Sequence, residues 1–267
     1  MSVTLEPHGD VLRVRLSHWR SRVVGYEVSA YIYRDTLIDT GFPAVADELA
    51  AVAFEHGVAG ALVTHHHEDH SGGVTALAAH RLPVGMSPVT RQLMRGLHVP
   101  LYRKIVWGSM GRGPDLVAPY VPSGLTLLAA PGHSVDHHVV WDAERSTMFG
   151  GDLWLGVKVR VAHPGEDPRL HARTLRAIAA LRPDRFFDGH RGLVPNASGA
   201  LIAKAVWIES MIAAVDDRIN FGWTDRRIAT ELLGREPFTR WVSNGEYSKQ
   251  MFVRAVRSSR QPVAGSR

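Results

Sequence analysis

A cluster of histidines that follows a short apolar segment places the strongest constraint on how this chain folds. Residues 60–64 read Gly-Ala-Leu-Val-Thr, which is short and apolar enough for a buried strand. The pattern H-x-H-x-D-H comes next and supplies four candidate ligands, His65, His67, Asp69 and His70. Imidazoles crowded at a strand end repel one another when protonated, whereas a metal ion binds their neutral forms. The cluster therefore predicts a metal site at the end of a buried strand.

The order of the remaining elements predicts a layered α/β fold with sheets inside and helices outside. Strands are expected at 11–16, 28–33, 36–39, 60–64, 82–85, 125–130, 138–141, 147–149 and 185–187. Helices are expected at 43–56, 71–80, 89–96, 167–181, 197–219, 224–233 and 246–258. The catalytic domain is expected to span residues 1–219, and residues 220–267 are expected to form a basic helical appendage.

The segment 86–124 is rich in glycine and proline and predicts a loop-rich insertion of the kind that often forms a lid or a binding loop. It carries three aromatic residues, Tyr102, Trp107 and Tyr120. Two interpretations remain open for these rings: they line a substrate entrance, or they anchor the loop to the body of the protein.

Composition excludes several kinds of chemistry. The chain has no cysteine, which rules out disulfides, thiolate zinc sites and cysteine nucleophiles. The first ten residues lack the apolar core of a signal peptide, and no run approaches 18 uninterrupted apolar residues. We therefore expect a cytoplasmic protein without membrane contact.

The net charge of +5 is concentrated near the C-terminus. From Asn220 onward nine Lys or Arg residues face four acidic residues, while the rest of the chain is balanced. Such a basic appendage suits an anionic substrate or a nucleic acid. The alternative is that the charges belong to a solvated helical surface, and the orientation of Arg254 and Arg257 would discriminate between the two.

Three further motifs follow the histidine cluster in chain order. They are Pro131-Gly-His133, Phe149-Gly-Gly-Asp152 and Asp188-Gly-His190, and an earlier segment reads Asp39-Thr-Gly. Together with H-x-H-x-D-H, they resemble the signature of the metallo-β-lactamase superfamily over residues 11–190. The resemblance implies an αββα sandwich of two β-sheets flanked by helices, with a small helical C-terminal appendage.

The same resemblance implies a complete ligand set for two divalent metal ions. One metal would be bound by His65, His67 and His133, the other by Asp69, His70 and His190, and Asp152 would bridge them. Two metals at such a site can share a water and lower its pKa toward about 7, and Asp69 would orient this nucleophile as the catalytic residue. Zinc is the first expectation, with iron or manganese as alternatives. Asp39 would support the site without binding metal.

The expected activity is hydrolysis of a small ester, thioester or lactone, by resemblance to enzymes such as glyoxalase II. One alternative is an endoribonuclease or another phosphodiester hydrolase of the superfamily. A second is a persulfide dioxygenase that uses one iron. Antibiotic hydrolysis is disfavoured, because the lactamases use either a cysteine ligand or a pattern that lacks the bridging Asp152.

The expected partner is a small-molecule substrate, anionic if the basic appendage reaches it, and a homodimer is left open. Two residues beside the ligands keep alternative roles. His137 either supports a metal ligand or is an ordinary structural histidine. Arg191 stands where many relatives have glycine, and it either meets an anionic group or lies on the surface.

Overall fold

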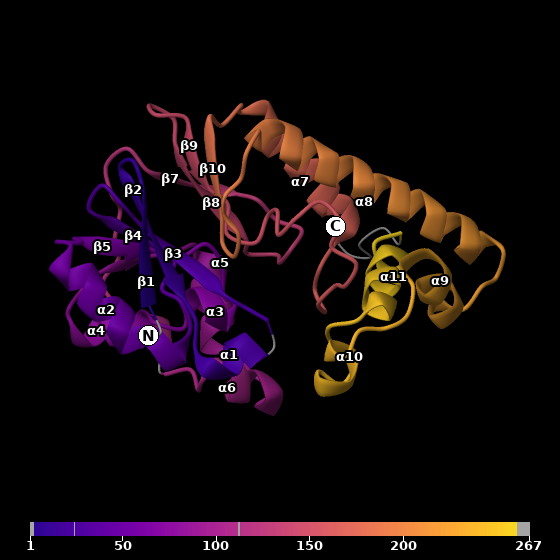
Figure 1. Cartoon of the computed structure of the whole chain (residues 1–267), viewed down its shortest axis with the longest axis horizontal. Helices are drawn as coiled ribbons and strands as arrows, with labels where there is room; N and C mark the ends of the chain where they lie inside the picture. The colour runs from indigo at the N-terminus through magenta and orange to yellow at the C-terminus, as the bar shows by residue number, and fades with distance from the viewer. Residues whose placement is uncertain (1–2, 24, 112, 261–267) are drawn as a thin grey trace, which may run out of the picture. The chain divides into compact units, whose positions relative to one another are not determined.

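The computed structural model describes residues 3–23, 25–111 and 113–260, and these form two compact units (Figure 1). The first unit comprises Met1–Ala129, Asp136–Leu155 and Pro183–Pro195. The second comprises Ala130–Val135, Gly156–Arg182 and Asn196–Arg267. The predicted boundary between residues 219 and 220 falls at the end of a long helix and stays a prediction.

A six-stranded sheet in the first unit has the order β1-β2-β3-β4-β5-β6. Its strands are β1 (Val3–His8), β2 (Val11–Leu16), β3 (Val28–Tyr33), β4 (Thr36–Ile38), β5 (Gly60–Leu62) and β6 (Val84–Gly85). The first four pair antiparallel, and β4, β5 and β6 pair parallel. The sequence predicted every strand of this sheet except β1, whose alternation is weakened by Pro7.

The second sheet of the first unit has five strands in the order β11-β10-β9-β8-β7. They are β7 (Thr126–Ala129), β8 (His138–Asp142), β9 (Thr147–Phe149), β10 (Arg185–Asp188) and β11 (Gly192–Leu193). Strands β9 and β10 are parallel, so that their carboxyl ends lie at the same edge of the sheet. Asp152 and His190 follow these two ends.

The two sheets pack against each other through buried aromatic and aliphatic side chains. Tyr31, Tyr33 and Leu62 of the first sheet form one cluster with Phe149 and Phe187 of the second. The Phe149 and Phe187 rings stack with centroids 5.3 Å apart, and buried aromatic rings of this kind dominate core energetics. The opposite face of the first sheet forms a separate core with helices of the same unit.

Helices of the first unit connect its strands. They are α1 (Trp19–Val23), α2 (Ala46–Glu55), α3 (Glu68–Ser71), α4 (Val74–Ala79), α5 (Pro88–Arg95), α6 (Leu101–Trp107) and two 3-10 turns, η1 (Pro43–Val45) and η2 (Gly113–Leu116). Residues 63–67 connect β5 to the very short α3. Asp69 and His70 therefore lie shortly after the end of the strand.

The helix expected at 89–96 is confirmed as α5, whereas the remainder of the segment 86–124, which was expected to be loop-rich, also contains α6 and η2. Its prolines and glycines mark the ends of these helices. Ser87 caps α5 by accepting a hydrogen bond from Thr90, and Pro88 occupies the first turn. Gly108, with φ 97°, ends α6.

Two aromatic rings of the insertion anchor it to the body of the first unit. Trp107 is buried against Phe42, with centroids 4.9 Å apart. The hydroxyl of Tyr120 lies 3.0 Å from Oγ1 of Thr36, within hydrogen-bond range. For these two residues the anchoring interpretation holds.

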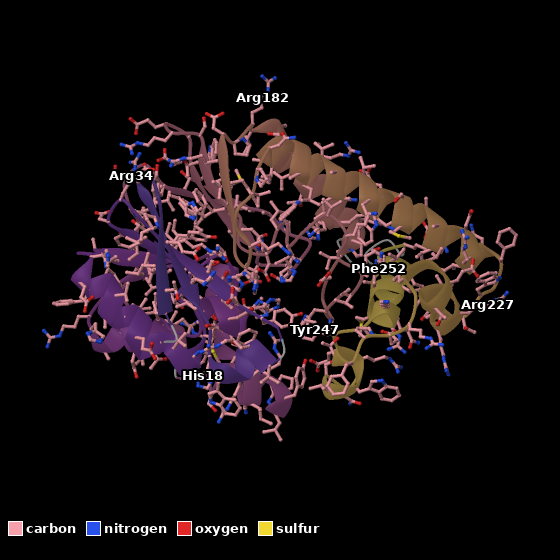
Figure 2. All side chains as sticks on the ribbon, in the orientation of Figure 1. His18, Arg34, Arg182, Arg227, Tyr247 and Phe252 are labelled. Carbon is pink, nitrogen blue, oxygen red and sulfur yellow. The ribbon has the colours of Figure 1, made fainter. Side chains whose placement is uncertain are left out.

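The second unit is helical. Its elements are α7 (Pro168–Ala180), α8 (Ala197–Asn220), α9 (Asp225–Leu233), α10 (Thr239–Val242) and α11 (Lys249–Ser258). Helices α7 and α8 run side by side, and α9 packs on α11 (Figure 1). Phe252 of α11, which is labelled in Figure 2, packs against Trp207 of α8, with ring centroids 5.9 Å apart.

Helix α8 is long and apolar enough to cross a membrane by length and composition alone. Core helices of soluble proteins meet the same criterion, so this is weak evidence. Its buried residues, which include Leu201 and Val215, belong to the packed helical unit. The expectation of no membrane contact stays a prediction.

Candidate metal centre

Six of the seven predicted ligands come together in the first unit, at the ends of three strands. His65 and His67 follow β5, and α3 presents Asp69 and His70. Asp152 follows β9 and His190 follows β10. Five of these residues are at most 8% exposed, and His190 is partly exposed. The packing of the two sheets therefore converts motifs far apart in sequence into one cluster.

The first group of ligand atoms belongs to His65, His67 and Asp152, and these atoms lie within 4.8 Å of one another. Nε2 of His65 is 2.9 Å from Nδ1 of His67, and Oδ2 of Asp152 is 4.0 Å from Nε2 of His65. Burial foremost, with the neighbouring imidazoles, lowers the pKa of His65 well below its ordinary value. His65 is therefore neutral at pH 7, which is the form that binds metal.

The second group belongs to Asp69, His70 and His190, again with ligand atoms within 4.8 Å of one another. Asp152 faces this group with its other oxygen. Oδ1 lies 3.0 Å from Nε2 of His70 and 3.2 Å from Nε2 of His190. The two oxygens of one carboxylate thus point to the two groups, as a bridging residue would require.

The cluster has the electrostatic character of a cation site. Burial alone would lower the pKa of His190, but the carboxylates of Asp152 and Asp69 raise it to about 9. Burial likewise opposes protonation of His70, and the same two acids together with Asp39 raise its pKa well above the ordinary range. Buried carboxylates at this position therefore favour positive charge beside them, which a metal ion supplies.

Oxygen acceptors orient the two histidines of the second group. Nδ1 of His70 lies 2.7 Å from Oδ2 of Asp39, and Nδ1 of His190 lies 2.6 Å from the carbonyl oxygen of Glu27. Each ring therefore directs Nε2 toward Asp152. Metal-binding histidines in proteins characteristically have their second nitrogen fixed in this way, so the donor set fits a bound divalent metal.

Asp39 connects β4 to the metal motif. Its Oδ1 accepts a hydrogen bond of 2.8 Å from the backbone N–H of Thr64, and its Oδ2 accepts one of 3.1 Å from the Thr64 hydroxyl. Asp39 adopts φ 59°, a left-handed conformation that aspartate tolerates better than most residues. This matches the supporting role that the resemblance implied.

His137 contacts the backbone of Asp152, a candidate metal ligand, as the first of its two predicted roles requires. Its Nε2 accepts a 3.0 Å hydrogen bond from the backbone N–H of Asp152. Burial foremost lowers the pKa of His137 to about 4. A neutral ring with Nε2 as acceptor therefore fixes the loop that carries Asp152.

Arg191 closes the turn that presents His190. Oδ1 of the buried Asp188 accepts hydrogen bonds from the backbone N–H groups of His190 and Arg191, at 2.9 and 2.8 Å. Nε of Arg191 donates to the carbonyl oxygen of Leu155 at 2.7 Å. Sequence reasoning did not assign Asp188 this role, although an aspartate that bonds the backbone two residues on is a common turn device.

Sequence reasoning did not find the partners of three other residues near the site. Asp136 accepts a 2.8 Å hydrogen bond from the backbone N–H of His66. Buried Glu68 pairs with Arg103 of α6. Tyr26 lies edge-on to His190 with centroids 6.3 Å apart, and burial, then Asp69 and Asp152, raise its pKa. Only the fold reveals these contacts, because their partners are distant in sequence.

The seventh predicted ligand, His133, is buried in the segment Ala130–Val135 of the second unit. This turn is held firmly on α7. The backbone N–H of Asp167 donates to the carbonyl of Gly132 at 2.8 Å, and the Thr174 hydroxyl donates to that of Pro131 at 2.6 Å. Gly132 has φ 137°, and a Cβ there would lie 2.4 Å from Cα of His171.

The basic residues of the C-terminal region are partly neutralised within the second unit. Arg257 pairs with Asp225 at 2.7 Å, and Arg254 approaches the same carboxylate at 3.9 Å. Arg260 pairs with Asp216 at 3.2 Å. Three of the nine cations counted in the sequence thus have acidic partners on neighbouring helices.

The comparison with known families supports the geometry. The model of the metallo-beta-lactamase superfamily matches residues 25–190, more than half of the chain. The chain belongs to this superfamily. Its matched region contains all seven predicted ligands.

Two curated relatives indicate the range of the superfamily that this member resembles. The thioesterase pkgB of Emericella nidulans is 28% identical over 75% of this chain and 59% of its own length. The hydroxyacylglutathione hydrolase of Thiobacillus denitrificans is 34% identical over 55% of this chain and 52% of its own length. The chain spans 49% to 62% of the length of the first curated relatives that it matches.

Solved structures confirm the predicted fold class. The metallo-β-lactamase FIM-1 from Pseudomonas aeruginosa, in its mono-zinc form, superposes with a TM-score of 0.61. The superposition covers 79% of this chain and 96% of that protein at 17% identity. The chain therefore has the αββα metallo-β-lactamase fold, followed by a helical C-terminal region, as the sequence predicted.

Proposed function

We propose that this protein is a dinuclear metal-dependent hydrolase that acts on a small ester, thioester or lactone. The observation that carries the proposal is the position of Asp152 between two groups of buried ligand atoms. Its Oδ2 faces His65, and its Oδ1 lies close to His70 and His190. A carboxylate shared in this way can bridge two metals, which lie about 3.5–4 Å apart in two-metal sites.

In the proposed site, one metal is held by His65, His67 and His133, and the other by Asp69, His70 and His190. Asp152 contributes to both. The assignment of His133 rests on the resemblance of Pro131-Gly-His133 to the second metal motif of the superfamily, whose family model covers this residue.

When bound, the metals would supply Lewis acidity and a water of lowered pKa. The protein contributes orientation and charge. Asp69 lies at the edge of the cluster, with Oδ2 3.6 Å from Nε2 of His190, and it is placed to accept a proton or a hydrogen bond from the attacking water. Asp39 and the carbonyl oxygen of Glu27 keep His70 and His190 oriented throughout the reaction.

The proposed substrate class rests on the relatives and on the charge of the second unit. A thioesterase and a hydroxyacylglutathione hydrolase are among the proteins that this chain resembles. The pairing of Arg254 and Arg257 with Asp225 offsets part of the positive charge that would suit a nucleic acid. Zinc is the proposed metal because the ligands are imidazoles and carboxylates. A cytoplasmic location and a homodimer also stay predictions.

Elemental analysis combined with substrate assays tests the proposal. We expect about two metals per chain and turnover of a thioester, ester or lactone that is lost on chelation and restored by zinc. The Asp152→Asn variant should lose activity, whereas Asp10→Asn, a surface carboxylate of the same unit, should not. One iron per chain with oxygen consumption on a persulfide would overturn the proposal, as would chelator-sensitive cleavage of RNA alone.

A further inference from the structure

His133 faces a carboxylate that the ligand motifs do not include. Oε1 of Glu166 lies 3.7 Å from Nδ1 of His133, and the two side chains are 17% and 9% exposed. This separation exceeds a hydrogen bond, so the attraction is electrostatic. A carboxylate beside the second nitrogen of a metal-binding histidine orients the ring and raises its basicity.

A tight turn fixes Glu166. The segment reads His163-Pro-Gly-Glu166, with Gly165 at φ 97°, and the backbone N–H of Glu166 donates to the carbonyl of His163 at 3.2 Å. Proline followed by glycine with positive φ is the pattern of a type II turn. Oε1 of Glu166 also accepts a 3.0 Å hydrogen bond from the backbone N–H of His163. A backbone group of the same turn therefore fixes the position of the Glu166 carboxylate.

The C-terminal region holds this turn in place. The backbone N–H of Ala162 donates to the carbonyl of Ser248 at 3.3 Å, as part of an isolated antiparallel bridge. The rings of His163 and Tyr247 pack with centroids 5.2 Å apart. Ser248 also caps α11 by accepting a 3.0 Å hydrogen bond from the N–H of Met251. Figure 2 labels Tyr247 in the segment that precedes this helix.

We propose that Glu166 is a positioning residue for His133, and that residues 247–248 of the C-terminal region keep it in place. All of these contacts lie within the second unit. The C-terminal region would therefore help to determine the affinity of the protein for one of the two metals. This inference rests on the proposed function, because it takes His133 to be a metal ligand.

The Glu166→Gln variant tests the charge without changing the shape. Its amide oxygen can still accept the hydrogen bond from His163, but the negative charge beside His133 is lost. We expect the affinity for one of two zinc ions to fall about 10- to 100-fold, measured by competition with a chromogenic chelator. The other zinc affinity and the melting temperature of the metal-free protein should match the wild type. The matched control is Glu209→Gln on α8, whose carboxylate pairs with Arg176 on the surface.

The Tyr247 variants test the connection to the C-terminal region. Tyr247→Phe keeps the ring against His163 and should bind zinc like the wild type. Tyr247→Ala removes the ring and should weaken the same single zinc that Glu166→Gln weakens. If both zinc affinities are unchanged in Glu166→Gln and in Tyr247→Ala while wild type binds two zinc ions, the inference fails and the proposed function stands. If wild-type protein binds no zinc, both fail.

Discussion

The imidazole of His137 accepts a hydrogen bond of 3.0 Å from the backbone N–H of Asp152. Both residues are buried, so the N–H has no access to water when the ring is removed. An unsatisfied buried donor costs about 1–3 kcal/mol.

We therefore expect His137→Leu to lower the free energy of unfolding by about 1–3 kcal/mol and to reduce metal stoichiometry, because the loop that carries Asp152 is released. His137→Gln, which retains an acceptor, should lose less. Urea unfolding of the metal-free protein and elemental analysis measure the two effects. Normal stability and full metal content in His137→Leu would contradict this role.

The metal-free protein should be most stable near pH 6.5. The pKa of His190 rises from 6.5 to about 9 on folding, so its contribution is fully present below pH 6.5 and is lost as pH rises through 9. The pKa of His137 falls to about 4, so stability also declines as pH falls from 6.5 toward 4. A tenfold change in proton affinity on folding corresponds to about 1.4 kcal/mol of stability.

Chemical denaturation of the metal-free protein between pH 4 and 9.5 checks this profile. His190→Gln should reduce the slope of the alkaline limb, to which His70 with its raised pKa also contributes, and should leave the acid limb in place. A stability that keeps rising from pH 6.5 to 9 would contradict the assignment.

The sequence placed the candidate ligands at strand ends, because each one follows a short apolar run that can be recognised locally. A short apolar run before His65 and another before His190 were sufficient to place both residues at an edge of a sheet. The supporting residues could not be found in this way. Glu68 is 35 positions from Arg103, and the carbonyl of Glu27 is 163 positions from His190. Only the folded topology shows which distant groups meet.

Local signals also misled in one segment. Gly108 and the glycines and prolines that follow it were interpreted as loop residues, but Gly108 ends α6, and Gly113 and Pro114 belong to η2. These residues have the same preference for helix ends as for loops. The strand β1 was missed because it lies at an edge of the sheet beside β2, where its exposed side chains, together with Pro7, weaken the apolar alternation.

Asp39 should determine how firmly the second metal is bound. Asp39→Asn tolerates the left-handed backbone at φ 59° and keeps an oxygen for Thr64, but it loses the charge beside Nδ1 of His70. We expect metal affinity to fall about 10- to 100-fold with the fold intact. Titration against a chelator measures the affinity, and circular dichroism checks the fold. An unchanged affinity would show that Asp39 serves only the backbone of Thr64.

Breaking the buried pair of Glu68 and Arg103 should lower the free energy of unfolding strongly, whereas replacing both residues together should lower it much less. Glu68 is fully buried, and burial foremost raises its pKa even though Arg103 opposes the shift. Arg103→Met leaves the carboxylate without its cation, which should destabilise the protein by about 3–5 kcal/mol.

The double variant Glu68→Met, Arg103→Met should recover most of that loss, because it leaves no buried charge and fills a similar volume. Urea unfolding of the metal-free single and double variants measures the difference. Equal destabilisation in the Arg103→Met variant and the double variant would contradict this expectation. It would mean that the pair stabilises the protein by the packing of α6 against α3 and that its charges contribute little.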